Sequence, residues 1–334
     1  MSEEKKKQVK KKARSEKPEK AAAAKKAKPE KNSFRQYMDS FLVALGIALV
    51  IRAVVIYPFR IPTGSMEDSL LVGDFLLANK FVYGVRSPDW IGIPYTKIGF
   101  KIPFFRTPGF RKPQSGDVVI FKYPKDITLN YIKRCVGTSG DTVMVRNKTL
   151  TVNRKPFPNP PKSKFIYNLL PEGYTEYSIF PPGAGNRDNY GPVRVPAPGD
   201  TFRFTRSNRS TWFERFQLAL YEGHRLELMY RGQRVPLTIE NQSEWLTVIE
   251  RAMPDEITLD GKRLDETVYT VKNRHYFLMG DNRDNSLDSR YWGFLPERLV
   301  VGEALIIYWS WDSETPLYRL LRKIRWGRLL NLIH

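Results

Sequence analysis

The sequence predicts a mainly β protein, in which an antiparallel β-sheet core with an inserted second lobe follows one N-terminal transmembrane helix. Three observations predict this fold class. One long apolar run precedes residue 58, and short β-branched and aromatic runs bounded by Gly, Pro and Asp dominate after it. Residues 156–198 hold 10 of the 24 prolines in the chain, more than a sheet interior could absorb.

The charge of the chain is unevenly placed. It carries 55 Lys and Arg against 35 Asp and Glu, a net charge of +20, and residues 1–36 contribute 14 basic and 5 acidic side chains, or +9. This segment has no periodic apolar face, so we expect a disordered basic cytoplasmic tail. An apolar fraction of 41% excludes disorder of the whole chain, and the single Cys135 excludes a disulfide scaffold. Nucleic acid and an anionic membrane surface would both suit this charge.

The apolar run decides between these two partners. Residues 37–57 are predicted to form a transmembrane anchor, whose stretch FLVALGIALVIRAVVIY is broken only by Arg52 and would span ~26 Å as a helix. The positive-inside rule leaves the tail in the cytoplasm and the chain from Pro58 outside. No small-residue cleavage site follows the run, so we expect an uncleaved single-pass anchor. A large exoplasmic domain disfavours nucleic acid as the partner.

Short strands are expected to build the core from residues 58–152 and 271–316. The runs with strand character are Asp117–Pro124, Asn130–Gly137, Asp141–Arg146, His275–Met279 and Leu299–Trp309. Two hairpin turns are expected within the exposed domain, at Asn147-Lys148 and at Asp260-Gly261.

The segments outside this core are less regular. Residues 153–270 form the predicted Pro-rich lobe, with a short helix expected at Thr211–Glu222. Residues 317–334 form a basic amphipathic segment, with five basic residues, no acidic one, and Leu and Ile spaced for one helical face. A lipid contact and a packed terminal helix are both open for this segment. A lipid contact is also open for the apolar stretch Trp90–Phe105.

Ser65 is the first candidate for chemistry. It lies in the run IPTGSM, only eight residues after Tyr57, so the extended chain keeps it within ~28 Å of the predicted anchor. Gly64 would let the backbone approach a ligand closely, and Ser65 supplies a hydroxyl beside it. By itself, such a Gly-Ser pair more often forms an ordinary turn.

Lys133 is the second candidate, on the predicted strand that contains YIKRC. Strand alternation places Tyr131, Lys133 and Cys135 on one face. A lysine on such a face can be desolvated, and desolvation lowers the pKa of a lysine. Arg134 could not serve as a base, because a guanidinium does not deprotonate in proteins. An ordinary half-exposed strand lysine is the simpler alternative from the strand alone.

The third candidate is the polar run MGDNRDNSLDSRYWG, from Met279 to Gly293. Its Asp and Asn residues resemble a calcium loop at first sight. The EF-hand pattern fails, however, because Arg283 stands at its third position and no glycine stands at its sixth. We interpret the run as a loop in which Asp–Arg pairs fix the backbone and hydroxyls point inward.

Other nucleophilic schemes lack the residues that they need. The chain has three histidines, no Gly-x-Ser-x-Gly turn, no zinc-ligand spacing and no obvious histidine to activate Cys135. A Ser–Lys pair remains, in which a neutral lysine takes the proton of a serine hydroxyl. We expect neither a cofactor nor a metal.

Three motifs, in this order, resemble those of the bacterial type I signal peptidases, or leader peptidases. They are IPTGSMEDSLLVGDFLLANKFVYG within residues 51–84, SGDVVIFKYPKD and NYIKRCVGTSGD within residues 115–145, and MGDNRDNSLDSRYWGFLPE within residues 276–307. The resemblance implies a membrane-anchored Ser/Lys endopeptidase of mainly β fold. Such an enzyme would cleave signal peptides from exported preproteins after small residues, at A-x-A-like sites, on the exoplasmic (periplasmic) side of the bacterial cytoplasmic membrane.

The resemblance also implies roles for individual residues. Ser65 would be the nucleophile and Lys133 the general base. The backbone N–H of Ser65 and the hydroxyl of Thr63 would form the oxyanion hole. The supporting residues would be Ser286, which orients the lysine by a hydrogen bond, and Asp281, Asp288 and Arg290, which shape the site.

The chain departs from the family pattern in places. Thr63 stands where the best-known members have Ser, Tyr57 stands where Glu is common, and only one anchor is expected. The lobe at 153–270 matches no motif, so its role is not carried over. Two alternatives remain: a self-cleaving Ser/Lys protease of related fold, and a membrane-tethered binding module whose basic tail contacts lipid or nucleic acid.

Overall fold

The computed structural model describes residues 33–54, 56–87, 90–92, 99–160, 163–312 and 314–333. The chain divides into two compact units, Met1–Ile51 and Arg52–His334. Of the predicted basic tail, residues 1–32 lie outside the described residues.

The first unit contains most of the helix α2 (Ser33–Val54), which covers the larger part of the predicted anchor at 37–57. Its sequence favours a helix because Leu, Ala and Met are strong helix formers and no proline interrupts them. Large apolar side chains of this helix are exposed, among them Phe41, Leu42, Val43 and Ile47. No helix in the described part of the chain combines the length and the hydrophobicity that a membrane span needs.

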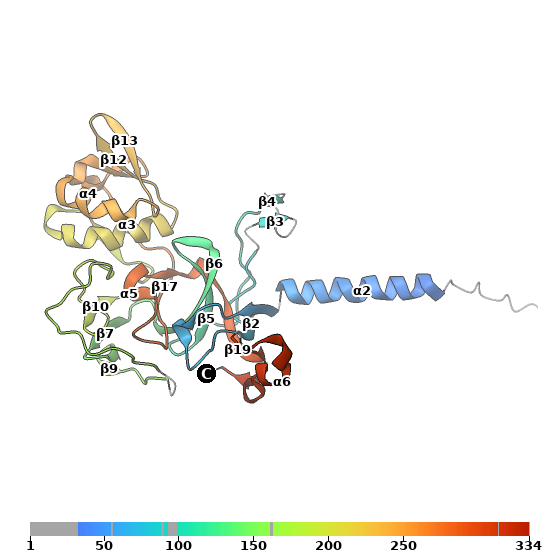
Figure 1. Ribbon diagram of the computed structural model, residues 1–334. Coiled ribbons are helices and arrows are strands. Elements are labelled where there is room, and N and C mark those ends of the chain that lie inside the picture. Colours follow the sequence, from blue (N-terminus) through green and yellow to red (C-terminus); the bar gives the residue numbers. More distant parts are fainter. Residues whose placement is uncertain are drawn as a thin grey trace, which may run out of the picture. The chain divides into compact units, whose positions relative to one another are not determined.

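The second unit is built around an eight-stranded antiparallel sheet, with the order β1-β2-β19-β5-β6-β17-β18 and with β20 paired to β19 (Figure 1). The predicted mainly antiparallel β fold is therefore confirmed. All five predicted strand runs form strands: four lie in this sheet (β5, β6, β17 and β19), and the run Asp141–Arg146 forms a strand of the second sheet. The strands are β1 (Ile56–Arg60), β2 (Asp74–Asn79), β5 (Val118–Tyr123), β6 (Asp126–Gly137), β17 (His275–Met279), β18 (Leu295–Pro296), β19 (Val300–Ser310) and β20 (Asn331–Leu332).

Side chains alternate along β6 as the sequence predicts. Cys135 belongs to an apolar cluster with Val119 and Phe121, whereas Ile132 belongs to another cluster with Met66. Because successive strand residues point to opposite faces, the sheet is covered by apolar side chains on both sides at this strand. A polar side chain on β6 is thus placed in surroundings with little water.

A second antiparallel sheet, of order β10-β7-β8-β9, joins the predicted core to the predicted lobe. Its strands are β7 (Thr142–Arg146), β8 (Thr149–Val152), β9 (Lys155–Pro156) and β10 (Tyr190–Arg194). The predicted boundary at residue 153 falls between β8 and β9, inside this sheet. The hairpin turn at Asn147-Lys148 is confirmed, and its φ values of 48° and 65° are those that a two-residue type I′ turn requires.

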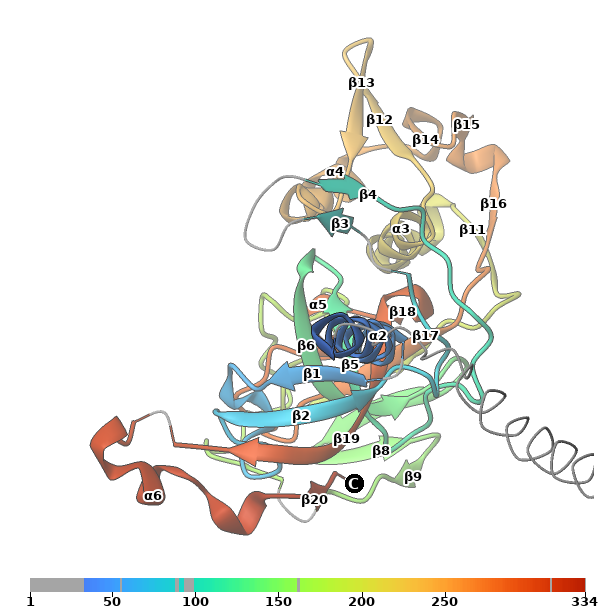
Figure 2. The same cartoon turned by 90° about the vertical axis from the view of Figure 1, so that its right-hand side faces the viewer.

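The rest of the predicted lobe contains two helices and two small sheets, which lie together at one end of the unit (Figures 1 and 2). The helix predicted at Thr211–Glu222 is confirmed as α3, and the hairpin at Asp260-Gly261 joins β14 to β15. The elements are β11 (Thr201–Arg203), α3 (Trp212–Tyr221), β12 (Leu226–Tyr230), β13 (Gln233–Leu237), α4 (Trp245–Arg251), β14 (Ile257–Leu259), β15 (Lys262–Arg263) and β16 (Val268–Thr270).

The lobe and the second sheet share one hydrophobic core. A single cluster of buried side chains extends from Val136 at the end of β6 through Tyr190 on β10 to Trp212 and Trp245 on the two helices. Aromatic rings of this size each bury a large apolar area, so they stabilise the attachment of the lobe.

The C-terminal segment does not form the helix that its spacing predicts. Its described residues form the short turns η7 (Leu317–Arg319), α6 (Leu320–Lys323) and η8 (Trp326–Arg328), followed by β20. Leu321 is 75% exposed while Ile324 is buried, so these two residues do not share an apolar face. The reason is competing backbone pairing, because Ile324 forms a β-bridge with Trp311 and β20 pairs with β19.

The remaining elements are short. In the apolar stretch at residues 90–105, two strands pair as a hairpin and residues 93–98 lie outside the described residues. These elements are β3 (Trp90–Gly92), β4 (Gly99–Lys101), α5 (Ser289–Trp292), η2 (Arg206–Thr211), η3 (Gln242–Glu244), η4 (Pro254–Glu256), η5 (Leu264–Glu266) and η6 (Glu297–Leu299).

Candidate active site

Ser65 lies in a single 3-10 turn, η1 (Gly64–Met66), which follows strand β1. The side chains of Ile61 and Met66 are buried on either side of Ser65 and belong to one apolar cluster. Thr63 precedes the turn in an extended conformation, with φ −134° and ψ 156°, and its exposed side chain makes no capping hydrogen bond. Packing therefore fixes the backbone that carries Ser65 without using the Thr63 hydroxyl as a cap.

Lys133 extends from β6 to this turn. Its Nζ forms a hydrogen bond of 2.6 Å with the Oγ of Ser65 and donates to the carbonyl of Ile132 at 3.1 Å. The residue is only 3% exposed, and its amine lies 5.4 Å from the centre of the Tyr131 ring. The predicted face of β6 thus carries a buried lysine whose amine contacts the predicted nucleophile.

Burial changes the protonation of this amine. Loss of water lowers the pKa of Lys133 from 10.5 to about 8, while the carboxylates of Asp288 and Asp281 oppose the shift. Desolvation dominates because the charged ammonium is the form that loses most by leaving water. A substantial fraction of Lys133 is therefore neutral in weakly alkaline solution and able to accept a proton.

The loop that follows β17 holds the turn from the other side. The backbone N–H of Asn282 donates to the carbonyl of Ser65 at 3.2 Å, and the Asn282 side-chain amide donates to the carbonyl of Gly64 at 3.1 Å. Gly280 packs so closely that a Cβ there would lie 2.4 Å from the Ser65 carbonyl oxygen and 2.2 Å from the Oγ of Ser286. Only glycine allows this approach of the two backbones.

Two buried ion pairs stabilise the same loop. Arg134 donates to Asp281 through both Nε and Nη2, at 2.9 and 2.8 Å, and Arg290 pairs with Asp288 in the same bidentate way at the same distances. Asp288 also accepts the N–H of Gly280 at 3.1 Å. Burial by itself would raise the pKa of the Asp288 carboxyl, but Arg290 outweighs this effect and holds that pKa below its ordinary value.

One predicted contact does not form. Among the described residues, the amine of Lys133 has no hydrogen bond with Ser286; its bonds are those with Ser65 and the carbonyl of Ile132. The Oγ of Ser286 is buried without a hydrogen-bond partner and lies against Gly280. The expected orientation of the lysine by Ser286 is therefore corrected, since Ile132 supplies the hydrogen bond instead.

The structure also adds residues that sequence reasoning did not assign. Gly280 and Asn282 contact the turn that carries Ser65, and Arg134, rejected as a base, is the ion-pair partner of Asp281. Gly280, the glycine in MGDN, could have been identified from the sequence, because a glycine beside polar residues often marks a place where two backbones approach closely. Its partner, the Ser65 carbonyl, is distant in sequence and could not be identified without the fold.

The chemistry of this arrangement is defined by the serine and the lysine. A hydroxyl in contact with a buried amine of lowered pKa can become a nucleophile, with the amine as its base. The described residues contain no group of three or more His, Cys, Asp and Glu side chains that could hold a metal ion. This pair supplies the two groups that a hydrolase with a serine nucleophile and a lysine base would use.

Comparison with known proteins makes the assignment more specific. The family model described as "Signal peptidase, peptidase S26" matches residues 34–202 and 225–309, which is more than half of the chain. The chain belongs to this signal peptidase family.

Individual relatives agree with the family model. Signal peptidase I of Pseudomonas aeruginosa is 32% identical over 289 residues, which cover 83% of this chain and 73% of the relative. Signal peptidase I of Buchnera aphidicola from Schizaphis graminum is 30% identical over 85% of this chain and 78% of its own. That of Aquifex aeolicus is 28% identical over 83% and 84%. A crystal structure of a signal peptidase I from Enterococcus faecalis is 20% identical and covers 58% of this chain and 97% of its own, with a TM-score of 0.22.

Proposed function

We propose that this protein is a membrane-bound serine endopeptidase that cleaves N-terminal signal peptides from exported preproteins. The observation that carries the proposal is the 2.6 Å hydrogen bond between the Oγ of Ser65 and the Nζ of Lys133, in a chain of the signal peptidase family. The lowered pKa of Lys133 supports its role as the base. The reaction needs no cofactor and no metal.

The first half of the reaction forms an acyl-enzyme. The Oγ of Ser65 attacks the carbonyl carbon at the end of the signal peptide, while its proton passes to the neutral amine of Lys133. The resulting oxyanion accepts hydrogen bonds from the Ser65 N–H and the Thr63 hydroxyl, and the extended conformation and exposure of Thr63 leave that hydroxyl available. The C–N bond then breaks, and the ammonium of Lys133 returns the proton to the leaving amine of the mature protein.

The second half releases the signal peptide. A water molecule gives its proton to the amine of Lys133 and attacks the ester carbonyl. Collapse of this second tetrahedral intermediate breaks the C–O bond, and the proton returns from Lys133 to the Oγ of Ser65. One lysine therefore acts as base and acid in both halves, which its pKa of about 8 permits.

The buried ion pairs act on this chemistry indirectly. Asp281 and Asp288, neutralised by Arg134 and Arg290, hold the loop whose Asn282 and Gly280 fix the backbone of Ser65. Ser286 belongs to the same loop, and its unpartnered hydroxyl supports a contact with substrate rather than with the lysine. The apolar cluster that contains Ile61 and Met66, beside Ser65, suits small side chains at an A-x-A-like site.

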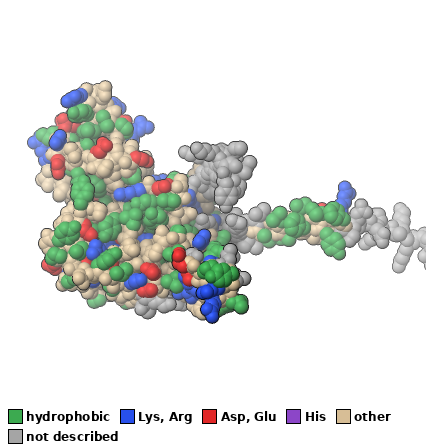
Figure 3. All heavy atoms as spheres, in the orientation of Figure 1, with side chains coloured by type: hydrophobic (Ala, Val, Ile, Leu, Met, Phe, Trp, Pro, Cys, Tyr) green, Lys and Arg blue, Asp and Glu red, His purple; other side chains and the backbone are tan. Residues whose placement is uncertain are grey.

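We propose that α2 anchors the protein in the membrane through its part of the predicted segment 37–57, whose last residues, Ile56 and Tyr57, belong to strand β1. Its described side chains are mostly hydrophobic and exposed (Figure 3). The charged residues Arg35 and Asp39 stand near its beginning in the sequence. A helix with large exposed apolar residues such as Phe41 and Ile47 is better accommodated in lipid than in water. The +9 tail supports a cytoplasmic N-terminus, so the catalytic unit would face the periplasm at the bacterial inner membrane.

The function is tested with the full-length protein in detergent and a purified preprotein that carries an A-x-A site. We expect one cleavage, identified by mass spectrometry of the new N-terminus. Ser65→Ala should abolish it, a loss of ~10⁶-fold in kcat for a removed nucleophile. Ser207→Ala is the matched control, because Ser207 is an exposed serine in the distant turn η2. Cleavage by Ser65→Ala at the wild-type rate would refute the assignment of the nucleophile.

A further inference from the structure

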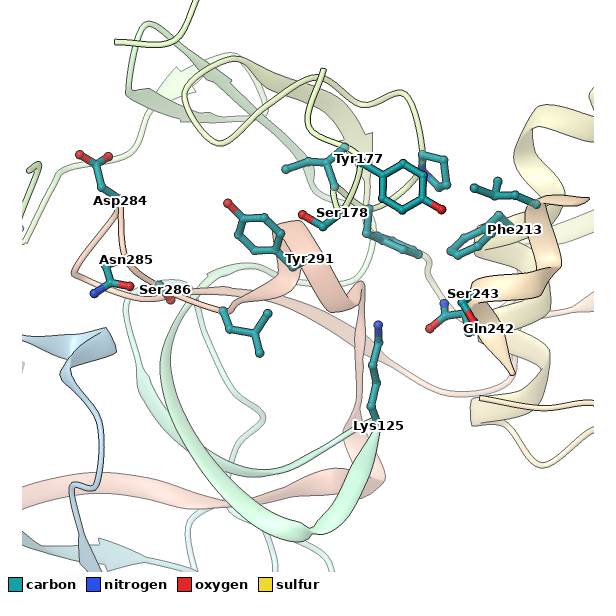
Figure 4. A pocket seen from close by; sticks show the side chains of 15 residues that line it. Lys125, Tyr177, Ser178, Phe213, Gln242, Ser243, Asp284, Asn285, Ser286 and Tyr291 are labelled. Carbon is teal, nitrogen blue, oxygen red and sulfur yellow. The ribbon is translucent and has the colours of Figure 1, made fainter. Parts of the chain in front are cut away.

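A pocket of about 540 Å³ lies between the active-site loop and the second lobe. Its walls come from the segment after Asp284, from residues 177–182 and from the lobe (Figure 4). The mechanism described above assigns a substrate contact to Ser286 but does not say which part of the substrate this pocket binds. We propose that it binds the segment of the preprotein that follows the cleaved bond, the beginning of the mature protein, and that it favours an acidic side chain there. This inference rests on the proposed function.

Ser286 connects the pocket to the active site. It lines the pocket, and its Oγ lies beside Gly280, whose missing Cβ would touch both that oxygen and the carbonyl oxygen of Ser65. A peptide whose reacting carbonyl is at Ser65 therefore needs to extend only past this loop to enter the pocket.

The polar groups of the pocket lack partners. The Oγ of Ser286 and the Oε1 of Gln242 are buried and have no hydrogen-bond partner among the described residues, and each residue is only 7% exposed. Both line the pocket from opposite sides (Figure 4). Buried acceptors without partners are costly. If each side chain turns toward the pocket, it can accept an N–H group of an extended peptide, which removes that cost.

The charge of the pocket indicates what it prefers. The Asp284 carboxylate pairs with Lys148, whose amine also lies 3.6 Å from Asp188, and it accepts the backbone N–H groups of Ile166 and Tyr167. Lys125 also lines the pocket, and its amine has no carboxylate partner in the described part of the chain. Lys125 is the only cation among the described residues that line the pocket, and its amine would attract an acidic side chain.

The size and polarity of the pocket exclude the signal peptide itself, the part of the substrate before the cleaved bond, as its occupant. Small residues before the cleaved bond require narrow pockets, and the apolar part of a signal peptide remains in lipid. Neither fits a pocket this large that contains a cation and two unpaired polar groups. Aromatic and aliphatic side chains, including Phe180, Phe213 and Leu246, form the rest of the wall and suit the varied residues of a mature protein.

The test uses three substrates with one signal peptide and one A-x-A site. The mature segment is acidic in the first, basic in the second, and ends two residues after the bond in the third. For each long substrate, kcat/KM is divided by the kcat/KM of the short substrate. We expect this ratio in wild type to be higher for the acidic substrate than for the basic one. Lys125→Glu should reverse this preference, with a total change of about threefold to tenfold for one exposed charge pair. Lys262→Glu, on the exposed strand β15, is the matched control and should keep the wild-type preference.

Each outcome separates the two levels of the proposal. If Lys125→Glu changes the cleavage of all three substrates equally, or leaves the preference unchanged, the pocket assignment is wrong. The proposed function still stands in that case, provided that wild type cleaves the substrates. Failure of wild type to cleave any substrate overturns the function itself. As a second measurement, Ser65→Ala is mixed with a substrate that carries a photoreactive group in its mature segment. Labelling of residues 177–182 or 242–246 supports the pocket, and labelling confined to other segments contradicts it.

Discussion

The amine of Lys133 lies 2.6 Å from the hydroxyl of Ser65, although 68 positions separate the two residues in the chain. The contact forms because the lysine extends from β6 on one side and the serine lies in a packed turn after β1 on the other. The lysine reaches the serine through apolar surroundings, so the same geometry that creates the contact also lowers the pKa of the base.

Activity should depend on the protonation of Lys133. We expect kcat/KM to rise with pH through about 8 and to level off above it, because the amine accepts a proton only when neutral and burial has lowered its pKa to about 8. The measurement is a pH–rate profile with a peptide substrate, with circular dichroism at each pH to verify that the protein stays folded. Lys133→Arg should be inactive throughout, since a guanidinium does not deprotonate. A profile that is flat across this range would contradict Lys133 as the base.

The Thr63 hydroxyl should matter more for the rate than for binding. Thr63→Val keeps the shape of the side chain but removes the donor, so kcat should fall by about 10²- to 10³-fold with little change in KM. Thr63→Ser restores the hydroxyl and should recover most of the activity. Steady-state kinetics on one peptide substrate compare the three proteins. Full activity of Thr63→Val would remove Thr63 from the oxyanion hole.

Gly280→Ala should damage both stability and activity. The added Cβ would lie 2.4 Å from the Ser65 carbonyl oxygen, so the loop must move away from the turn that carries the nucleophile. Overpacking of this kind typically costs about 1–3 kcal/mol, and displacement of Ser65 should lower kcat at least about tenfold.

Denaturant unfolding and kcat are measured for this variant and for Gly173→Ala. Gly173 is the matched control because its Cβ would meet no atom within 4 Å. Equal behaviour of the two variants would show that the close approach is unimportant.

The buried ion pair between Arg134 and Asp281 should be needed for folding. Arg134→Met leaves a buried carboxylate without its partner and should lower the free energy of unfolding by about 3–5 kcal/mol. Arg134→Met combined with Asp281→Leu removes both charges and should recover a large part of that loss. Arg194→Met breaks an exposed pair with Asp200 and should cost less than about 1 kcal/mol. Chemical denaturation provides all three values, and equal losses for Arg134→Met and Arg194→Met would contradict the prediction.

Local pattern was a good guide where local chemistry decides the structure. The turn at Asn147-Lys148, helix α3 and the alternation along β6 all follow from residue type and short-range spacing. The helix that the spacing of the C-terminal segment suggested does not form, because β pairing with Trp311 and with β19 competes with it, and a helical pattern read residue by residue does not reveal such pairing. The shared core of the lobe and the second sheet was unforeseen for the same reason.

The sequence by itself determined the mainly β fold, the apolar segment before it, and Ser65 and Lys133 as candidate residues, because periodicity and motif order are local properties. Only the tertiary structure decided that Gly280 and Asn282 hold the Ser65 backbone, that Ser286 does not bond the lysine, and that a pocket opens beside the loop. The physical reason is that burial and hydrogen bonding depend on every element packed around a group. The pKa of Lys133 is therefore a property of the folded protein, while its identity as a candidate base is a property of the chain.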